Sequence, residues 1–254
     1  MNVFNIKGIT FGQGKPVICI PVVKKEKDEI IQKIKELAAK GVQMIEWRVD
    51  AYQDVDQPQQ VADILAQIKP YLEKTVFLFT FRTKQQGGLR ELEEKKILYL
   101  NEIAAKSQAI DLLDLEFFEA SKPAKEIRRF QKMGVKIIAS HHDFDGTPDE
   151  RILHMLMDQM EAGGADIAKL AVMPNDFDDV IRLMKLMNDT RGHFPNLPFI
   201  MISMGKMGSI SRICGEAFGS CVTFGTDGEA SAPGQMPLDR LEQMLSWLHE
   251  SMES

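Results

Sequence analysis

The sequence predicts an α/β protein, a (β/α)₈ TIM-type barrel with a short N-terminal β-hairpin closing its bottom. Eight short runs rich in valine, isoleucine and phenylalanine alternate with helix-length amphipathic segments. Such alternation favours parallel strands with helices outside them. Eight units in 254 residues match the size of a closed barrel. A doubly wound open sheet is the alternative, but it usually carries a glycine-rich nucleotide turn after its first strand. Here "PVVKKEKDE" follows that strand, which favours the barrel.

Each strand is expected where β-branched and aromatic residues cluster, and each helix where apolar residues recur every three or four positions. The first helix ends at Gly41 and the fifth begins after Thr147-Pro148, both common helix boundaries. The expected strands cover 16–23, 42–50, 75–82, 109–116, 135–142, 165–172, 198–205 and 221–227. The expected helices lie near 28–40, 58–70, 90–106, 121–133, 148–162, 176–190, 207–217 and 237–250. The stretch "VFNIKGITFG" (3–12) predicts the hairpin, and residues 1–254 are expected to form one barrel domain.

Composition excludes several classes of function. The net charge is -6 and no run rich in Lys and Arg stands out, so a nucleic-acid partner is not expected. Apolar runs such as "TVFLFTF" fall far short of the roughly 18 residues of a membrane span, and "MNVFNIKGIT" lacks the apolar core of a signal peptide. The three cysteines show no metal-ligand spacing and indicate a reducing compartment. A cytoplasmic protein is therefore expected.

Chemistry in such barrels takes place at the carboxyl ends of the strands, so the direction of the side chains there is informative. Neighbouring residues in a strand point to opposite faces. Apolar residues such as Trp47 and Phe79 suit the helix-facing side, and in "SHH" the same alternation turns His141 outward. The opposite side then faces the barrel interior near its mouth, and it carries Glu46, Arg48, Arg82, His142 and Lys169.

Lys169 lies within the apolar stretch "DIAKLAV" (166–172), where an ammonium group is costly to desolvate. It could be only the ion-pair partner of Glu46 or Glu116, and His142 could be a satisfied core histidine. However, three cations, a carboxylate and an imidazole from four strands are too much buried charge for packing alone, which indicates a functional site. A desolvated lysine beside arginines is favoured in its neutral, nucleophilic form and can form a Schiff base. His142 would then move protons, and the arginines, with no carboxylate assigned to them, suggest an anionic substrate.

The sequence resembles the type I 3-dehydroquinate dehydratase family along nearly its whole length. The matching stretches are "EWRVD", "TFR" followed by "GG", "SHHDF", "AKLAVMP", "ISMGKMGSISR", "FGS", "TFG" and "SAPGQ". The resemblance implies a (β/α)₈ barrel, usually a homodimer, that needs no metal or organic cofactor. It also implies removal of water from 3-dehydroquinate to give 3-dehydroshikimate, a step of the shikimate pathway of aromatic amino acid biosynthesis.

The resemblance implies a role for eight residues. Lys169 resembles the residue that condenses with the C3 ketone of the substrate. His142 resembles the base that removes the C2 proton and assists departure of the C1 hydroxyl. The others resemble substrate-binding positions: Glu46, Arg48 and Arg82 around the hydroxyls and the imine, Arg212 at the carboxylate, and Ser231 and Gln235 in a loop over the ligand.

One position departs from the family pattern. The family usually carries a glutamate just before the glycine pair, where it contacts the catalytic histidine. This chain has Gln86 there, in "KQQGG". Glutamine keeps the hydrogen-bonding capacity but loses the charge, so the departure affects the tuning of His142 and not the type of reaction.

Two other functions stay open at this stage. A class I aldolase-like lyase also uses a barrel lysine, but its substrates are commonly phosphorylated. The loop "FGTDGEASAPG" is acidic at Asp227 and Glu229, which disfavours a phosphate there. A non-catalytic ligand-binding barrel would be expected to lose Lys169 or His142, and both are present.

Overall fold

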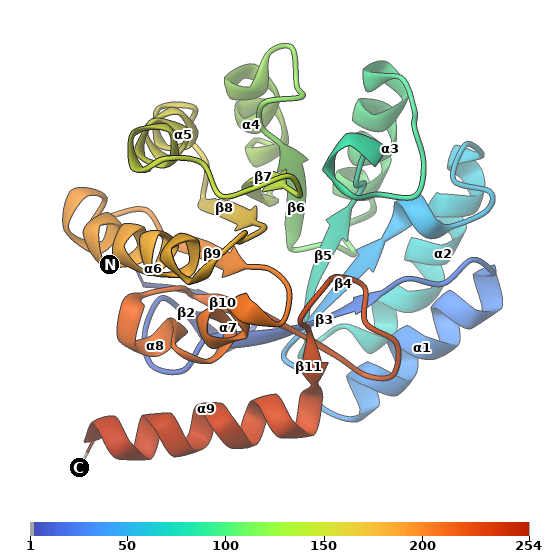
Figure 1. The fold of residues 1–254 in the computed structure, drawn as a ribbon. Helices are drawn as coiled ribbons and strands as arrows, with labels where there is room; N and C mark the ends of the chain where they lie inside the picture. The colour runs from blue at the N-terminus through green and yellow to red at the C-terminus, as the bar shows by residue number, and fades with distance from the viewer. Residues whose placement is uncertain (1–2, 254) are drawn as a thin grey trace.

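Strands and helices alternate along the chain as the sequence predicts (Figure 1) in the computed structural model, which describes residues 3–253. The barrel strands are β3 (Val17–Val22), β4 (Met44–Arg48), β5 (Val76–Thr80), β6 (Leu112–Glu116), β7 (Lys136–Asp143), β8 (Ile167–Val172), β9 (Phe199–Ser203) and β10 (Val222–Thr226). The helices are α1 (Lys27–Ala39), α2 (Pro58–Ile68), α3 (Glu94–Ser107), α4 (Pro123–Gln131), α5 (Glu150–Ala162), α6 (Phe177–His193), α7 (Ile210–Ile213), α8 (Gly215–Phe218) and α9 (Leu238–Glu253).

The strands form one parallel sheet whose two ends meet. Hydrogen-bonded neighbours follow the order β10, β3, β4, β5, β6, β7, β8, β9. An isolated parallel bridge joins Phe199 of β9 to Ser220, and the Cys221 amide donates to the Phe199 carbonyl oxygen over 2.8 Å. This seam closes the predicted barrel, with the helices around the outside (Figure 1). A further short strand, β11 (Met236–Pro237), pairs in parallel with β10.

Alternation along each strand separates two apolar clusters. Outside the sheet, Trp47 packs edge-on against Phe79, with ring centroids 5.6 Å apart, and both belong to the cluster beneath the helices. The lower barrel interior is filled by a second cluster that includes Met44, Leu78 and Ile138. The inward and outward assignments predicted from the sequence are therefore correct. Polar side chains occupy the same inward parity only at the upper, carboxyl ends of the strands.

The predicted hairpin closes the amino-terminal end of the barrel. β1 (Phe4–Ile6) pairs in antiparallel fashion with β2 (Ile9–Phe11). Lys7 and Gly8 between them have positive φ angles, as a two-residue hairpin turn requires. The Phe11 ring stacks on Phe4 at 4.9 Å, is fully buried and joins the interior cluster. The Lys7 ammonium binds the Asp111 carboxylate (2.7 Å) next to the start of β6.

One predicted helix is broken. Residues 207–217, expected to form one helix, instead form a 3₁₀ turn (Met207–Ser209) followed by the short helices α7 and α8. The Ser211 hydroxyl donates to the Gly208 carbonyl (2.8 Å) and accepts from the Ser203 amide (2.9 Å). A Cβ on Gly208 would lie 2.2 Å from the Ser203 carbonyl oxygen. These local contacts with the end of β9 compete with regular helical hydrogen bonds.

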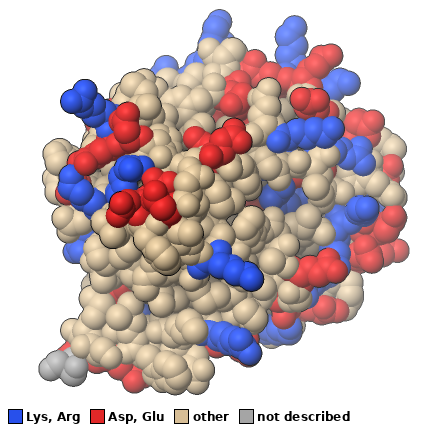
Figure 2. All heavy atoms as spheres, in the orientation of Figure 1, with Lys and Arg blue, Asp and Glu red and all other residues tan. Residues whose placement is uncertain are grey.

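Charges of both signs are interspersed around the rim of the face seen in Figure 1, and uncharged side chains cover much of the rest of that face (Figure 2). No helix in residues 3–253 combines the length and the apolar composition that a membrane crossing requires.

We predict that the hairpin stabilises the barrel through Phe11. Replacing Phe11 with alanine removes a fully buried ring and should lower the free energy of unfolding by about 3–5 kcal/mol. Urea unfolding followed by circular dichroism measures this loss. Tyr99→Ala is the control, because this ring on α3 is 52% exposed and its loss should cost little. Equal, small losses in both variants would show that the hairpin does not contribute to the core.

Candidate active site

A cavity opens at the carboxyl ends of the strands and contains every site residue predicted from the sequence. It encloses about 530 Å³, including the part open to solvent. Its walls include Glu46, Arg48, Arg82, His142, Lys169, Arg212, Ser231 and Gln235. Apolar side chains complete it, namely Phe144, Ala171, Ile202, Met204 and Phe224.

Lys169 points inward from β8 and is only 4% exposed. Its Nζ lies 3.5 Å from the Asp114 carboxylate on β6 and 4.5 Å from the centre of the Phe224 ring. The sequence left open an ion pair with Glu46 or Glu116 as the alternative to a catalytic role, but the carboxylate beside Lys169 is that of Asp114. Glu46 accepts a hydrogen bond from the Thr80 hydroxyl (2.8 Å).

Two of the arginines are paired, contrary to the prediction that they lack carboxylate partners. Arg48 makes a two-point contact with Asp50 at 2.8 and 2.9 Å. Arg82 binds Asp114 at 2.9 Å and Glu116 at 3.0 Å. Sequence reasoning missed Asp50 and Asp114 as components of the site, and it named Glu116 only as a possible partner of Lys169. Strand alternation in "LLDLE" would have turned Asp114 and Glu116 inward, because they share the parity of buried Leu112.

Arg212 of α7 is different, because no carboxylate of residues 3–253 lies within ion-pairing distance of it. Only 1% of the residue is exposed, and burial lowers the pKa of its guanidinium to about 10. Nη2 donates to the Pro233 carbonyl (2.8 Å), whereas Nε finds no acceptor among the described residues. An unpaired guanidinium in a cavity wall is suited to bind an anion, carboxylate above all.

His142 ends the inward face of β7, and a hydrogen-bonding side chain fixes its ring. The side-chain Oε1 of Gln86 accepts from the His142 backbone amide (2.9 Å) and lies 3.2 Å from ring Nδ1. Because this oxygen can only accept, the contact assigns a proton to Nδ1 and leaves the lone pair on Nε2. Burial, followed by the charges of Arg82, Lys169 and Arg48, lowers the pKa of His142 well below its usual value. The imidazole is therefore a neutral base at pH 7.

The adjacent histidine lies on the other side of the strand. The ring of His141 packs edge-on against Phe118, at a centroid distance of 5.3 Å. This placement agrees with the predicted parity and leaves His142 as the imidazole that lines the cavity.

The loop 228–235, between β10 and β11, covers one side of the cavity. The Gln235 carbonyl oxygen accepts from the Ser231 amide (2.7 Å), and its NH₂ group donates to the Ser231 hydroxyl (3.0 Å). The Gly205 amide donates to the Pro233 carbonyl (3.2 Å). Both predicted loop residues thus line the cavity while binding each other, which gives the loop a defined shape.

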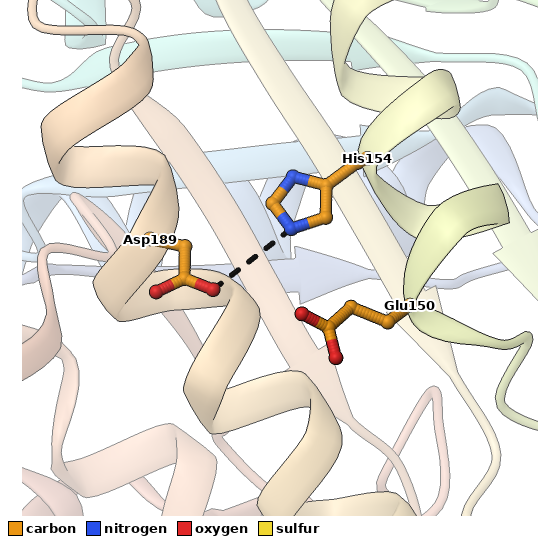
Figure 3. Close-up of side chains that lie close together, drawn as sticks. All are labelled: Glu150, His154 and Asp189. Atoms are coloured by element: carbon orange, nitrogen blue, oxygen red, sulfur yellow. Dashed lines mark ion pairs between the residues drawn. The ribbon is translucent and has the colours of Figure 1, made fainter.

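One group in residues 3–253 brings histidine and carboxylate ligand atoms close enough for a metal ion, and it lies outside the cavity. Glu150 and His154 of α5 face Asp189 of α6 (Figure 3), with their ligand atoms within 4.8 Å of one another. His154 Nε2 is 3.9 Å from the Asp189 carboxylate, and Glu150 also pairs with Lys185. These contacts connect two neighbouring helices on the surface.

Comparison with known proteins agrees with this geometry. The family model described as "Type I 3-dehydroquinase" matches residues 18–252. The chain belongs to the type I 3-dehydroquinase family. The 3-dehydroquinate dehydratase of Clostridioides difficile is 38% identical over 248 residues, 97% of each chain. That of Bacillus subtilis is 36% identical over 252 residues, 99% of each chain.

Solved structures of the type I 3-dehydroquinase family share the fold. The 3-dehydroquinate dehydratase of Geobacillus kaustophilus superimposes with a TM-score of 0.94 at 34% identity, covering 98% of this chain and 99% of that one. The Clostridium difficile enzyme, described with covalently modified comenic acid, gives a TM-score of 0.94 at 37% identity, with 99% and 100% covered.

Gln86 is the position at which the type I 3-dehydroquinase pattern predicts glutamate. The side chain is 2% exposed and held by a 3₁₀ turn (Lys84–Gln86). It contacts His142, so the substitution lies inside the site and is not a surface change. Its NH₂ group has no hydrogen-bond acceptor among the described residues.

We predict that Gln86→Glu moves the acidic limb of the kcat/KM profile to higher pH. A carboxylate beside Nδ1 favours the imidazolium and raises the pKa of His142, so the base becomes neutral only at higher pH. A shift of roughly one unit is expected for a close, poorly solvated pair. Steady-state rates over a range of pH measure it. Gln85→Glu is the matched control, because it makes the same change at an exposed neighbour. An unmoved limb in Gln86→Glu would show that this contact does not tune the base.

Proposed function

We propose that this protein removes water from 3-dehydroquinate to give 3-dehydroshikimate, the dehydration step of the shikimate pathway, through a Schiff base on Lys169. The mechanism rests on one observation, which is that two side chains from neighbouring strands line the same cavity. Lys169 on β8 and the neutral base His142 on β7 line one cavity, with the unpaired Arg212 in its wall. Family membership supports the substrate, and the buried lysine supports covalent catalysis.

The first step joins the substrate to the enzyme. The Nζ of Lys169 gives up one proton and attacks the C3 ketone, and the resulting carbinolamine takes up a proton as it loses one water, which gives an iminium ion. Arg212 binds the substrate carboxylate through its unsatisfied N–H groups and so orients the ring. Glu46, Arg48 and Arg82 surround the hydroxyl groups and the imine. This arrangement holds C2 near the lone pair of His142 Nε2.

Elimination follows from the iminium ion. Its positive charge acidifies the C2–H bond, His142 takes that proton, and the electron pair forms an enamine. The enamine then expels the C1 hydroxyl, to which His142 returns the proton, so that water leaves. Hydrolysis of the product iminium consumes one water and restores Lys169. The balance is the loss of one water per substrate.

Ser231 and Gln235 belong to the loop that we propose to close over the ligand. Their side chains line the cavity, and Gly228 and Gly234 have positive φ angles that help the loop turn back across the mouth. A closed loop would keep bulk water from the imine.

We also propose that the protein is one barrel domain that acts in the cytoplasm as a homodimer, without a metal or organic cofactor. Sedimentation equilibrium should give about twice the chain mass of 28.7 kDa, and a single-chain mass would contradict the dimer. Cell fractionation tests the location.

The Schiff base is tested by trapping. Borohydride added during turnover of 3-dehydroquinate should inactivate the enzyme irreversibly, because it reduces the imine to a stable amine. Mass spectrometry should place the adduct on the peptide containing "DIAKLAV". Lys169→Arg should neither trap nor turn over, because a guanidinium cannot act as the amine nucleophile.

Lys206→Ala is the control for trapping, because this lysine is exposed and its loss should leave the adduct in place. An adduct on Lys206 in the unmodified protein would overturn the assignment. Trapping with other ketones, without the conjugated product that absorbs in the ultraviolet, would indicate an aldolase-like lyase. Ligand binding without trapping or turnover would indicate a binding barrel.

A further inference from the structure

A buried carboxylate lies directly beside the proposed Schiff-base lysine, and the mechanism above gives it no role. Asp114 projects inward from β6, and its side chain is fully buried. Its Oδ2 lies 2.9 Å from Arg82 Nη2 and 3.5 Å from Lys169 Nζ. Its Oδ1 accepts a hydrogen bond from the Ser140 hydroxyl at 2.6 Å. Side chains from β7, β8 and the segment just after β5 therefore converge on this one carboxylate.

Asp114 is held as an anion. Burial by itself would raise the pKa of this carboxyl, but the charges of Arg82 and Lys169 and the Ser140 hydrogen bond outweigh it and lower the pKa. No donor in residues 3–253 makes a well-aligned hydrogen bond to Oδ2. This oxygen thus keeps lone-pair capacity on the side of the carboxylate that faces Arg82 and Lys169.

The other charged groups of the interior are engaged differently. Glu116 is bound by Arg82 and by the amide and hydroxyl of Thr83, and Glu46 by the Thr80 hydroxyl. The other ionisable groups of the upper interior are Cys19 on β3, Arg48 on β4, Arg82 just after β5, His142 on β7 and Arg212 on α7. Among the described residues, Asp114 is the carboxylate within 4.0 Å of Lys169 Nζ.

We propose that Asp114 is the counter-ion of the Lys169 nitrogen and keeps the imine protonated while the C2 proton is removed. This inference rests on the proposed function. The nitrogen is positive as an ammonium and again as an iminium, and only the protonated imine withdraws electrons strongly enough to acidify C2. A fixed negative charge next to it, in a site with little water, stabilises that protonated form. The Ser140 hydrogen bond positions the carboxylate.

The test is the alkaline limb of the kcat profile, which reports ionisations in the bound complex. Asp114→Asn keeps the shape of the side chain and an acceptor for Ser140 but removes the charge. The limb should move to lower pH by about one unit or more, and kcat should fall at least ~10²-fold, with a much smaller change in KM. A purely structural role would lower the rate at every pH and leave the limb in place.

Glu116→Gln is the matched control. It makes the same change two residues along the inward face of β6, at a carboxylate that contacts Arg82 but not the lysine nitrogen. Its alkaline limb should stay close to that of the unmodified enzyme. Equal shifts in both variants would mean that net interior charge, and not a specific counter-ion, sets the limb, and this would overturn the proposal.

Borohydride trapping separates failure of this inference from failure of the proposed function. If the unmodified enzyme forms no adduct on Lys169, the Schiff base itself is wrong. If the adduct forms and Asp114→Asn leaves the limb unmoved, the counter-ion alone is wrong. Circular dichroism checks folding. Should Asp114→Asn not fold, Asp114→Ser, which is smaller and keeps a hydroxyl beside Ser140, is measured with the same two expected outcomes.

Discussion

The upper half of the barrel depends on balancing charge that has been removed from water. A buried ion is costly unless partners and hydrogen bonds compensate for its lost hydration. Arg82 meets this requirement by binding Asp114 and Glu116 on the neighbouring strand and the Ser140 hydroxyl on the next one. The guanidinium therefore connects the segment just after β5 with β6 and β7 at the floor of the cavity. Removing one member would leave the others uncompensated, so the site must be assembled as a unit.

This network divides the site into fixed and available groups. Arg48 and Arg82 have carboxylates that balance their charge, so they shape the cavity more than they attract an anion. Arg212 has backbone carbonyls as its acceptors and keeps capacity for a ligand. Burial and, after it, the surrounding cations lower the pKa of His142 and keep it neutral, which suits a base. The same positive charges thus favour two different functions, anion binding and proton removal.

Strand alternation made much of this predictable from the sequence. It placed His142 inward and His141 outward, and it brought Lys169 to the cavity. Family motifs supplied Arg212, Ser231 and Gln235, which no periodicity reveals. The ion pairs were missed because parity gives the face of a strand but not the height at which two side chains meet. The helix expected at 207–217 failed because Ser211 and Gly208 make close contacts with β9 that helical periodicity does not represent.

The loop 228–235 is hydrogen-bonded to Arg212, because Nη2 of the guanidinium donates to the Pro233 carbonyl oxygen. An anion bound at Arg212 would therefore meet a side chain already oriented by this loop. Linkage requires that, if the loop strengthens binding of the anion, the anion stabilises this position of the loop by the same factor. The enclosure of the site would then be cooperative with occupancy. Release of a carboxylate product would then require two contacts of Arg212 to break together, the ion pair with the product and the hydrogen bond with the loop.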